Sequence, residues 1–291
     1  MSSFQLLKPH AKDLGGGFVV RRLLPAAAQQ AVGPFIFFDH FGPVTVEPAT
    51  NHDVRPHPHI GLATVTYLFD GVILHRDNLG YVQRIEPGAI NWMTAGRGIV
   101  HSERRPPEEA QTTYVNHGLQ LWLALPEAQE ETAASFTHTP ASAIPEVSID
   151  GVAVRVLVGE AFGAKSPVAT LSPTLYLDVQ LPPNARWTLP MLAQEQAVYS
   201  VKGSLTVAGE ELPNQSMAVL SEPTELMSGS DAVRLVVIGG QPLGRRFMWW
   251  NFVSTSKERI DIASAAWARG DASVGMGQVP GETERIDLPV R

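Results

Sequence analysis

The chain has 291 residues, of which 44% are hydrophobic and 18% charged, and it contains no cysteine. This apolar content is enough for a buried core and excludes a globally disordered chain. The lack of cysteine excludes a disulfide scaffold, a thiolate nucleophile and any cysteine-ligated zinc or iron–sulfur site. The net charge of −7 leaves no electrostatic footprint for nucleic acid, so direct nucleic-acid binding is not expected.

The start of the chain argues against a targeting signal. It carries Lys8, Lys12 and Asp13 where a secretory signal peptide would have an apolar core. No apolar run approaches the ~18 residues that a membrane span requires. We therefore expect a cytoplasmic protein without a membrane partner.

Short runs of β-branched and aromatic residues, separated by Gly, Pro, Asn or Asp, predict the strands of a sandwich or barrel. One such series surrounds Tyr67 and another surrounds Tyr199, and aligning these tyrosines also aligns Gly71 with Gly203. We interpret the two series as weak repeats of one all-β unit. Between them, residues 139–150 contain prolines and small residues that interrupt the pattern, which indicates a linker.

One helix is predicted near the end of the chain. Thr255 and Glu258 form a capping-box pattern with Thr255 as the N-cap, and Gly270 provides the stop. The apolar residues between these signals recur at helical spacing and should face the core; they are Ile260, Ala263 and Trp267.

Histidines are confined to the first 138 residues, which hold all nine of them. The remainder of the chain has neither His nor Cys, so it could build only an all-oxygen metal site. A transition metal, if one is bound, must therefore bind in the first half.

Two pairs of potential metal ligands are spaced at i and i+2, and they are His57 with His59 and His101 with Glu103. On a strand, this spacing places both side chains of a pair on one face. If the two segments meet, three nitrogens and one carboxylate converge. Such a set suits Fe(II), Mn, Ni, Co or Zn better than Mg or Ca. A single His-x-His often carries no metal, so the second pair is what favours a site.

Other polar residues of this half have simpler interpretations. His75 and Asp77 are predicted to form an exposed polar pair between a strand and a turn. His117 is expected to be a core histidine, with orientation of a ligand as the alternative. Three further residues could line a site or simply pack in the core, namely Trp92, Met93 and Gln120.

Two segments of the chain resemble the pirin family of the cupin superfamily. They are HPHIGLATVTY at residues 57–67 and NWMTAGRGIVHSE at 91–103. The segments GLQLW at 118–122 and PTLYLD at 173–178 are also similar. The resemblance runs from about Phe37 through the second half.

The resemblance implies an all-β bicupin, made of two jelly-roll-like β-barrels with a short C-terminal helix. Only the first barrel would hold a metal. The implied divisions are an N-terminal metal-binding cupin domain at 1–138, a C-terminal cupin domain without metal ligands at 139–245, and a tail with one helix at 246–291.

The family pattern places metal ligands on His57, His59, His101 and Glu103, with iron as the typical metal and Ni, Co, Mn or Zn as alternatives. It implies a dioxygenase of the quercetin 2,3-dioxygenase type that opens a flavonol-like ring with O2. Glu103 would then be both ligand and catalytic proton acceptor.

Two other functions stay open. One is a non-catalytic, redox-sensitive protein that contacts a protein partner, as a transcription coregulator or a regulator of a metabolic enzyme. The other is a metal with a structural role only. The chain also departs from many pirins at Ile60 and Ala63, where Arg and Glu are common, and these departures bear on substrate choice.

Overall fold

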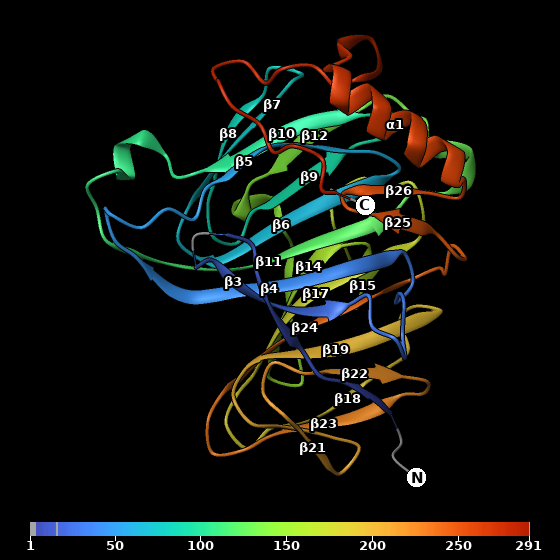
Figure 1. Ribbon diagram of the computed structural model, residues 1–291. Helices are drawn as coiled ribbons and strands as arrows, with labels where there is room; N and C mark the ends of the chain where they lie inside the picture. The colour runs from blue at the N-terminus through green and yellow to red at the C-terminus, as the bar shows by residue number, and fades with distance from the viewer. Residues whose placement is uncertain (1–3, 16, 291) are drawn as a thin grey trace. The chain divides into compact units, whose positions relative to one another are not determined.

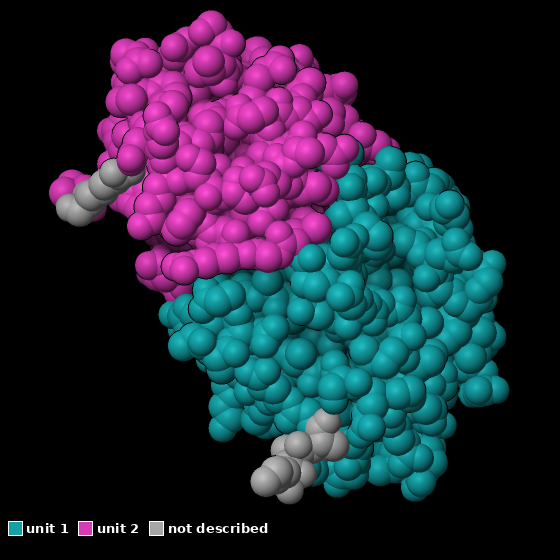
Figure 2. Space-filling view, turned by 90° about the vertical axis from the view of Figure 1, so that its right-hand side faces the viewer, with its two compact units in different colours: residues 1–11, 21–38, 139–242 teal, residues 12–20, 39–138, 243–291 magenta. Residues whose placement is uncertain are grey.

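The computed structural model describes residues 4–15 and 17–290. These residues form 26 strands, one α-helix and four short 3-10 helices, in agreement with the all-β prediction. The chain divides into two compact units, coloured separately in Figure 2. Unit 1 comprises residues 1–11, 21–38 and 139–242, and unit 2 comprises 12–20, 39–138 and 243–291. The predicted domain boundaries after residues 138 and 245 stay a prediction.

Unit 1 contains two antiparallel sheets (Figure 1). The larger has the order β1 (Gln5–Leu7), β22 (Met217–Leu220), β19 (Glu195–Lys202), β24 (Val233–Gly240), β17 (Thr174–Leu181), β14 (Val152–Val158) and β13 (Glu146–Ile149). The smaller has the order β18 (Arg186–Leu189), β23 (Thr224–Ser228), β20 (Leu205–Val207) and β21 (Glu210–Leu212). Side chains of both sheets form one buried hydrophobic cluster, which includes Leu177, Val237, Trp187 and Leu226. This burial joins the two sheets.

A second seven-stranded sheet has its central strands in unit 2. Its order is β12 (Ser135–Thr139), β9 (Ile90–Thr94), β6 (Leu62–Asp70), β11 (Tyr114–Ala124), β4 (Phe35–Val46), β3 (Val19–Leu24) and β2 (His10–Asp13). A four-stranded sheet of unit 2 has the order β5 (Val54–His59), β10 (Ile99–Arg104), β7 (Ile73–Asp77) and β8 (Val82–Ile85). A buried cluster that contains Leu68 of β6 and Ile85 of β8 joins these two sheets.

The remaining elements are short. Two hairpins are formed by β15 (Glu160–Ala161) with β16 (Ala164–Lys165) and by β25 (Phe247–Trp249) with β26 (Phe252–Ser254). The 3-10 helices are η1 (Pro107–Glu109), η2 (Glu127–Gln129), η3 (Ala141–Ala143) and η4 (Ala272–Val274). The α-helix is α1 (Lys257–Arg269), and it lacks the length and apolar character that a membrane crossing would need.

The internal repeat has a structural counterpart. Tyr67 of β6 and Tyr199 of β19 are both fully buried. Gly71 and Gly203 follow these strands with φ of 90° and 95°, a region that favours glycine. A Cβ on Gly71 would also lie 2.5 Å from the carbonyl oxygen of Val115, so no other residue fits there. Each unit therefore contains a strand with a buried tyrosine that ends in a glycine with positive φ.

The predicted linker at residues 139–150 begins where the chain passes from unit 2 to unit 1, but the segment has regular structure. The segment holds the end of β12, the helix η3 and the edge strand β13, which pairs with β14. Pro140 precedes η3 with φ of −65°, and the carbonyl of Pro145 accepts a hydrogen bond from the backbone of Val156. Prolines are compatible with a 3-10 turn and with the end of an edge strand, because neither position needs their missing N–H.

Helix α1 confirms the predicted buried face, with Ile260, Ala263 and Trp267 all in the core. It also confirms the stop at Gly270, which has a left-handed backbone. The predicted N-cap is wrong by one residue, because Ser256 accepts the capping bond from the backbone of Arg259. Thr255 instead donates its hydroxyl and its backbone N–H to the buried carboxylate of Glu130, which delays the helix start.

Replacing Ser256 with Ala should lower the free energy of unfolding by about 1 kcal/mol, because the first turn loses its side-chain acceptor. Urea denaturation of the full chain measures this change. Glu258→Gln serves as the control and should cost less than half as much, since Glu258 takes no part in the observed cap. If Glu258→Gln lowered the stability more than Ser256→Ala, the result would support the predicted capping box of Thr255 and Glu258 instead.

Candidate metal centre

The antiparallel pairing of β5 with β10 brings three of the four predicted ligands together. His101 lies directly opposite His57, and His59 lies opposite Ile99. Directly opposed residues of an antiparallel pair share a face, and so do residues two apart on one strand. All three imidazoles therefore leave the sheet on the same side.

Three histidines form a compact buried group. Each of His57, His59 and His101 offers one ring nitrogen, and these three nitrogens lie within 4.8 Å of one another. The Nε2 atoms of His59 and His101 are 3.1 Å apart. Trp122 meets the ring of His59 edge to face at 5.1 Å and contributes to its burial. This geometry is compatible with a single transition-metal ion.

The histidines are held in their neutral form. Burial lowers the pKa of His57 to about 4. Burial also lowers the pKa values of His59 and His101 well below their usual range, and the neighbouring His57 lowers both further. Nδ1 of His57 lies 2.9 Å from the backbone carbonyl of Arg55, to which it donates, so Nε2 remains available. Neutral imidazoles with available lone pairs are the ligands that Fe, Ni, Co and Zn accept, so the donor set fits such a metal.

Glu103 lies outside the 4.8 Å histidine group. A register shift between His101 and Glu103 on β10 interrupts the simple alternation expected from their spacing. Burial raises the pKa of the Glu103 carboxyl to about 7, although a hydrogen bond from Thr66 opposes this. The same Thr66 hydroxyl lies 2.7 Å from Oε1 of Gln120. Glu103 thus changes its charge near neutral pH beside a polar pair, and its role as a ligand stays a prediction.

His75 and Asp77 are not the exposed pair that was expected, because their exposed fractions are only 2% and 1%. They lie on β7, which is an inner strand of the sheet because it pairs with β10 on one side and with β8 on the other. Neither edge of β7 is therefore exposed to solvent. His75 stacks on Phe136 at 4.2 Å and its Nε2 lies 3.0 Å from Oδ2 of Asp77. The sequence did hold a signal, since these residues share the i, i+2 spacing of the ligand pairs.

The other expected residues lie in the core. His117 is buried, and its Nε2 lies 2.7 Å from Nε2 of His40, which no sequence pattern suggested. Trp92 and Met93 are buried in β9, while Gln120 is half-buried in β11.

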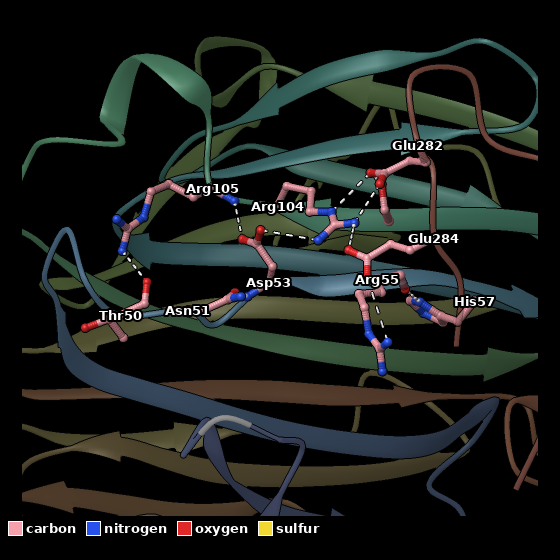
Figure 3. A network of polar contacts seen from close by, with 10 residues as sticks. Thr50, Asn51, Asp53, Arg55, His57, Arg104, Arg105, Glu282 and Glu284 are labelled. Carbon is pink, nitrogen blue, oxygen red and sulfur yellow. Dashed lines mark hydrogen bonds and ion pairs between the residues drawn. The ribbon is translucent and has the colours of Figure 1, made fainter. Parts of the chain in front are cut away.

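The outward sides of the ligand strands bind the end of the chain (Figure 3). Glu282 accepts hydrogen bonds from Ser102 at 2.6 Å and from Nη2 of Arg104 at 2.6 Å. The backbone of Ile286 donates to the carbonyl of Pro56 at 2.8 Å. Burial alone would raise the pKa of Glu282, but the hydrogen bonds from Arg104 and Ser102 outweigh it and lower that pKa. These contacts attach residues 282–286 to β5 and β10.

Comparison with known proteins identifies the fold family. The family model "Pirin" matches residues 17–123, and the model "Pirin C-terminal cupin domain" matches residues 176–273. A pirin-like protein of Caulobacter vibrioides is 45% identical over 263 residues, which are 89% of this chain and 91% of the relative. The chain belongs to the pirin family.

Two further relatives of this pirin carry the name of an enzyme. A Pseudomonas aeruginosa protein, provisionally named quercetin 2,3-dioxygenase, is 38% identical over 93% of this chain and 85% of its own length. The crystal structure of a quercetin 2,3-dioxygenase from Acinetobacter baumannii matches with a TM-score of 0.91 at 34% identity, covering 99% of this chain and 95% of that chain. The expected two-domain cupin fold is therefore confirmed.

The departure at Ile60 has a packing reason. Ile60 is buried in a hydrophobic cluster with Val100, Phe252 and residues of α1. An Arg side chain at this position would enter that apolar cluster with its charge unpaired. Ala63 is fully buried in β6. In this pirin, the side chain of Ile60 belongs to the hydrophobic cluster that packs helix α1.

We predict that His101→Ala weakens binding of Zn(II) by more than the roughly 10–100-fold that loss of an outer partner costs, because a direct ligand is removed. Competition with a chromogenic chelator measures the affinity. His10→Ala, a change of an exposed histidine, is the matched control and should bind Zn(II) as the parent does. Equal affinities for the two variants would contradict the site.

Proposed function

We propose that this pirin is a mononuclear metal-dependent dioxygenase of the quercetinase type, which opens a flavonol-like ring with O2. The observation that carries the proposal is the buried group of three neutral histidines. The similarity to the Acinetobacter baumannii quercetin 2,3-dioxygenase over 99% of the chain supports it. The alternative of a non-catalytic, redox-sensitive regulator is not favoured by these similarities. A protein partner and a cytoplasmic location stay predictions.

We propose His57, His59 and His101 as three metal ligands and Glu103 as the fourth. Fe(II) is the proposed metal, and Ni, Co, Mn and Zn also suit a nitrogen-rich donor set. When bound, the metal would act as a Lewis acid that lowers the pKa of a coordinating substrate hydroxyl.

The residues of the chain supply the remaining chemistry. As a carboxylate close to the histidines in sequence, Glu103 can accept the substrate hydroxyl proton. The nearby hydroxyl of Thr66 lowers the pKa of this carboxyl and so favours its ionised form. Deprotonation makes the aromatic ring electron-rich, as its reaction with O2 requires.

If Glu103 is the fourth ligand, Zn(II) affinity should depend on pH in one step. Below pH 7 the metal must displace the proton of Glu103, so affinity should fall roughly tenfold per pH unit, and above pH 7 it should level off. The histidines add no step down to pH 5, because the pKa of His57 is about 4 and the other two are also depressed. Glu103→Gln should bind more weakly and without this step. Chelator competition from pH 5 to 8 measures it, and an unchanged step in Glu103→Gln would remove Glu103 from the ligand set.

Catalysis is tested by supplying the iron-loaded protein with quercetin in air and recording flavonol loss and O2 uptake together. The parent protein and His10→Ala should consume both in equal amounts, since a dioxygenase places both oxygen atoms in its product. His101→Ala should show no more turnover than free iron. Turnover that is equal in His101→Ala and the parent would refute the proposal.

A further inference from the structure

On the side away from the other histidines, His101 continues into a buried chain of polar groups that the proposed reaction does not use. Its Nδ1 lies 3.4 Å from Nδ1 of His75, and Nε2 of His75 lies 3.0 Å from Oδ2 of Asp77. All three residues are buried. Water does not compete at such depth, so each polar atom is satisfied within the chain.

The turn after β7 holds the far end of this chain of groups. Oδ1 of Asp77 accepts hydrogen bonds from the backbone N–H groups of Leu79 at 2.9 Å and Tyr81 at 3.1 Å. Asp77 also lies directly opposite His101 in the pairing of β7 with β10. The backbone of the turn therefore fixes the position of the Asp77 carboxylate. That carboxylate in turn determines which ring nitrogens of His75 and His101 carry a proton.

The donors and acceptors then follow in order from Asp77. A carboxylate only accepts, so the proton of His75 lies on Nε2, facing Oδ2 of Asp77. Nδ1 of His75 is then a lone pair and can accept only from a proton on Nδ1 of His101. With its proton on Nδ1, His101 presents the lone pair of Nε2, the atom that lies 3.1 Å from Nε2 of His59.

We propose that His75 and Asp77 are positioning residues, which hold His101 in the tautomer and ring orientation that bind a metal through Nε2. The inference rests on the metal site of the proposed function, and it needs no turnover of any substrate. His57 is oriented by the backbone carbonyl of Arg55, which no substitution can remove. His101 depends on side chains instead, so its orientation can be changed by mutation.

Asp77→Asn is the most informative variant. It keeps the shape of the side chain, but it reverses which groups donate and which accept in the hydrogen bonds of residue 77, His75 and His101. The amide oxygen of the substituted side chain would keep the backbone bonds from Leu79 and Tyr81, which places the amide NH2 against Nε2 of His75. His75 would then carry its proton on Nδ1 and His101 would carry its own on Nε2, the metal-facing atom. We expect Zn(II) binding to weaken about 10–100-fold, as for other lost outer partners.

Asp271→Asn is the matched control. Its carboxylate also accepts a backbone N–H, from Ser273 at 3.1 Å, but it caps the 3-10 helix η4. This variant should keep the Zn(II) affinity of the parent in the same chelator competition. His75→Phe keeps an aromatic ring against Phe136 and removes the relay, so adding Asp77→Asn to it should cause no further loss of affinity.

A spectroscopic measurement on the parent protein makes the test independent of how well the variants fold. In ¹⁵N-edited spectra of the Zn(II)-loaded chain, His101 should be protonated on Nδ1 and His75 on Nε2. In Asp77→Asn the proton of His75 should move to Nδ1. A parent His75 protonated on Nδ1, or an unchanged Zn(II) affinity in Asp77→Asn, would overturn the proposal. Failure of quercetin turnover alone would refute the dioxygenase and leave this result intact.

Discussion

The pairing of β5 with β10 is the constraint on which the rest of the site depends. The register that sets His101 opposite His57 decides that three imidazoles leave the sheet together. A slip of one residue would turn His101 to the other face of the sheet and direct Ser102 toward His57. The contacts of Glu282 and Ile286 on the outward side of these strands oppose such a slip. Residues 282–286 therefore support the histidine group, although none of them is a member of it.

Burial gives the histidine group its chemistry. Imidazoles in water would be partly protonated just below neutral pH, and three of them at this distance would repel one another when charged. Here the low pKa values remove that repulsion and leave neutral rings with lone pairs that can bind a cation. The same burial raises the pKa of Glu103. One physical cause thus lowers the pKa values of the histidines and raises that of the carboxyl.

The order of the strands in the small sheet adds a further layer of control. Because β10 lies between β5 and β7, His101 has His57 and His59 on one side and the pair His75 and Asp77 on the other. The turn after β7 fixes Asp77 through backbone N–H groups. In the proposed arrangement, the position of Asp77 in this turn determines which nitrogen of His101 carries the proton, through the two hydrogen bonds made by His75.

Much of the protein could be read from local patterns. The sequence alone determined the strand pattern around Tyr67 and around Tyr199, the helix that ends at Gly270 and the two i, i+2 pairs. Each of these patterns depends only on residues close together in the sequence. The tertiary structure decided the helix start, the ordered structure of residues 139–150 and the burial of His75 and Asp77. Each depends on a partner distant in sequence, such as Glu130 for Thr255 or β10 for β7. A periodic pattern tells which residues share a face, but only the packed fold decides what that face meets and how much water remains there.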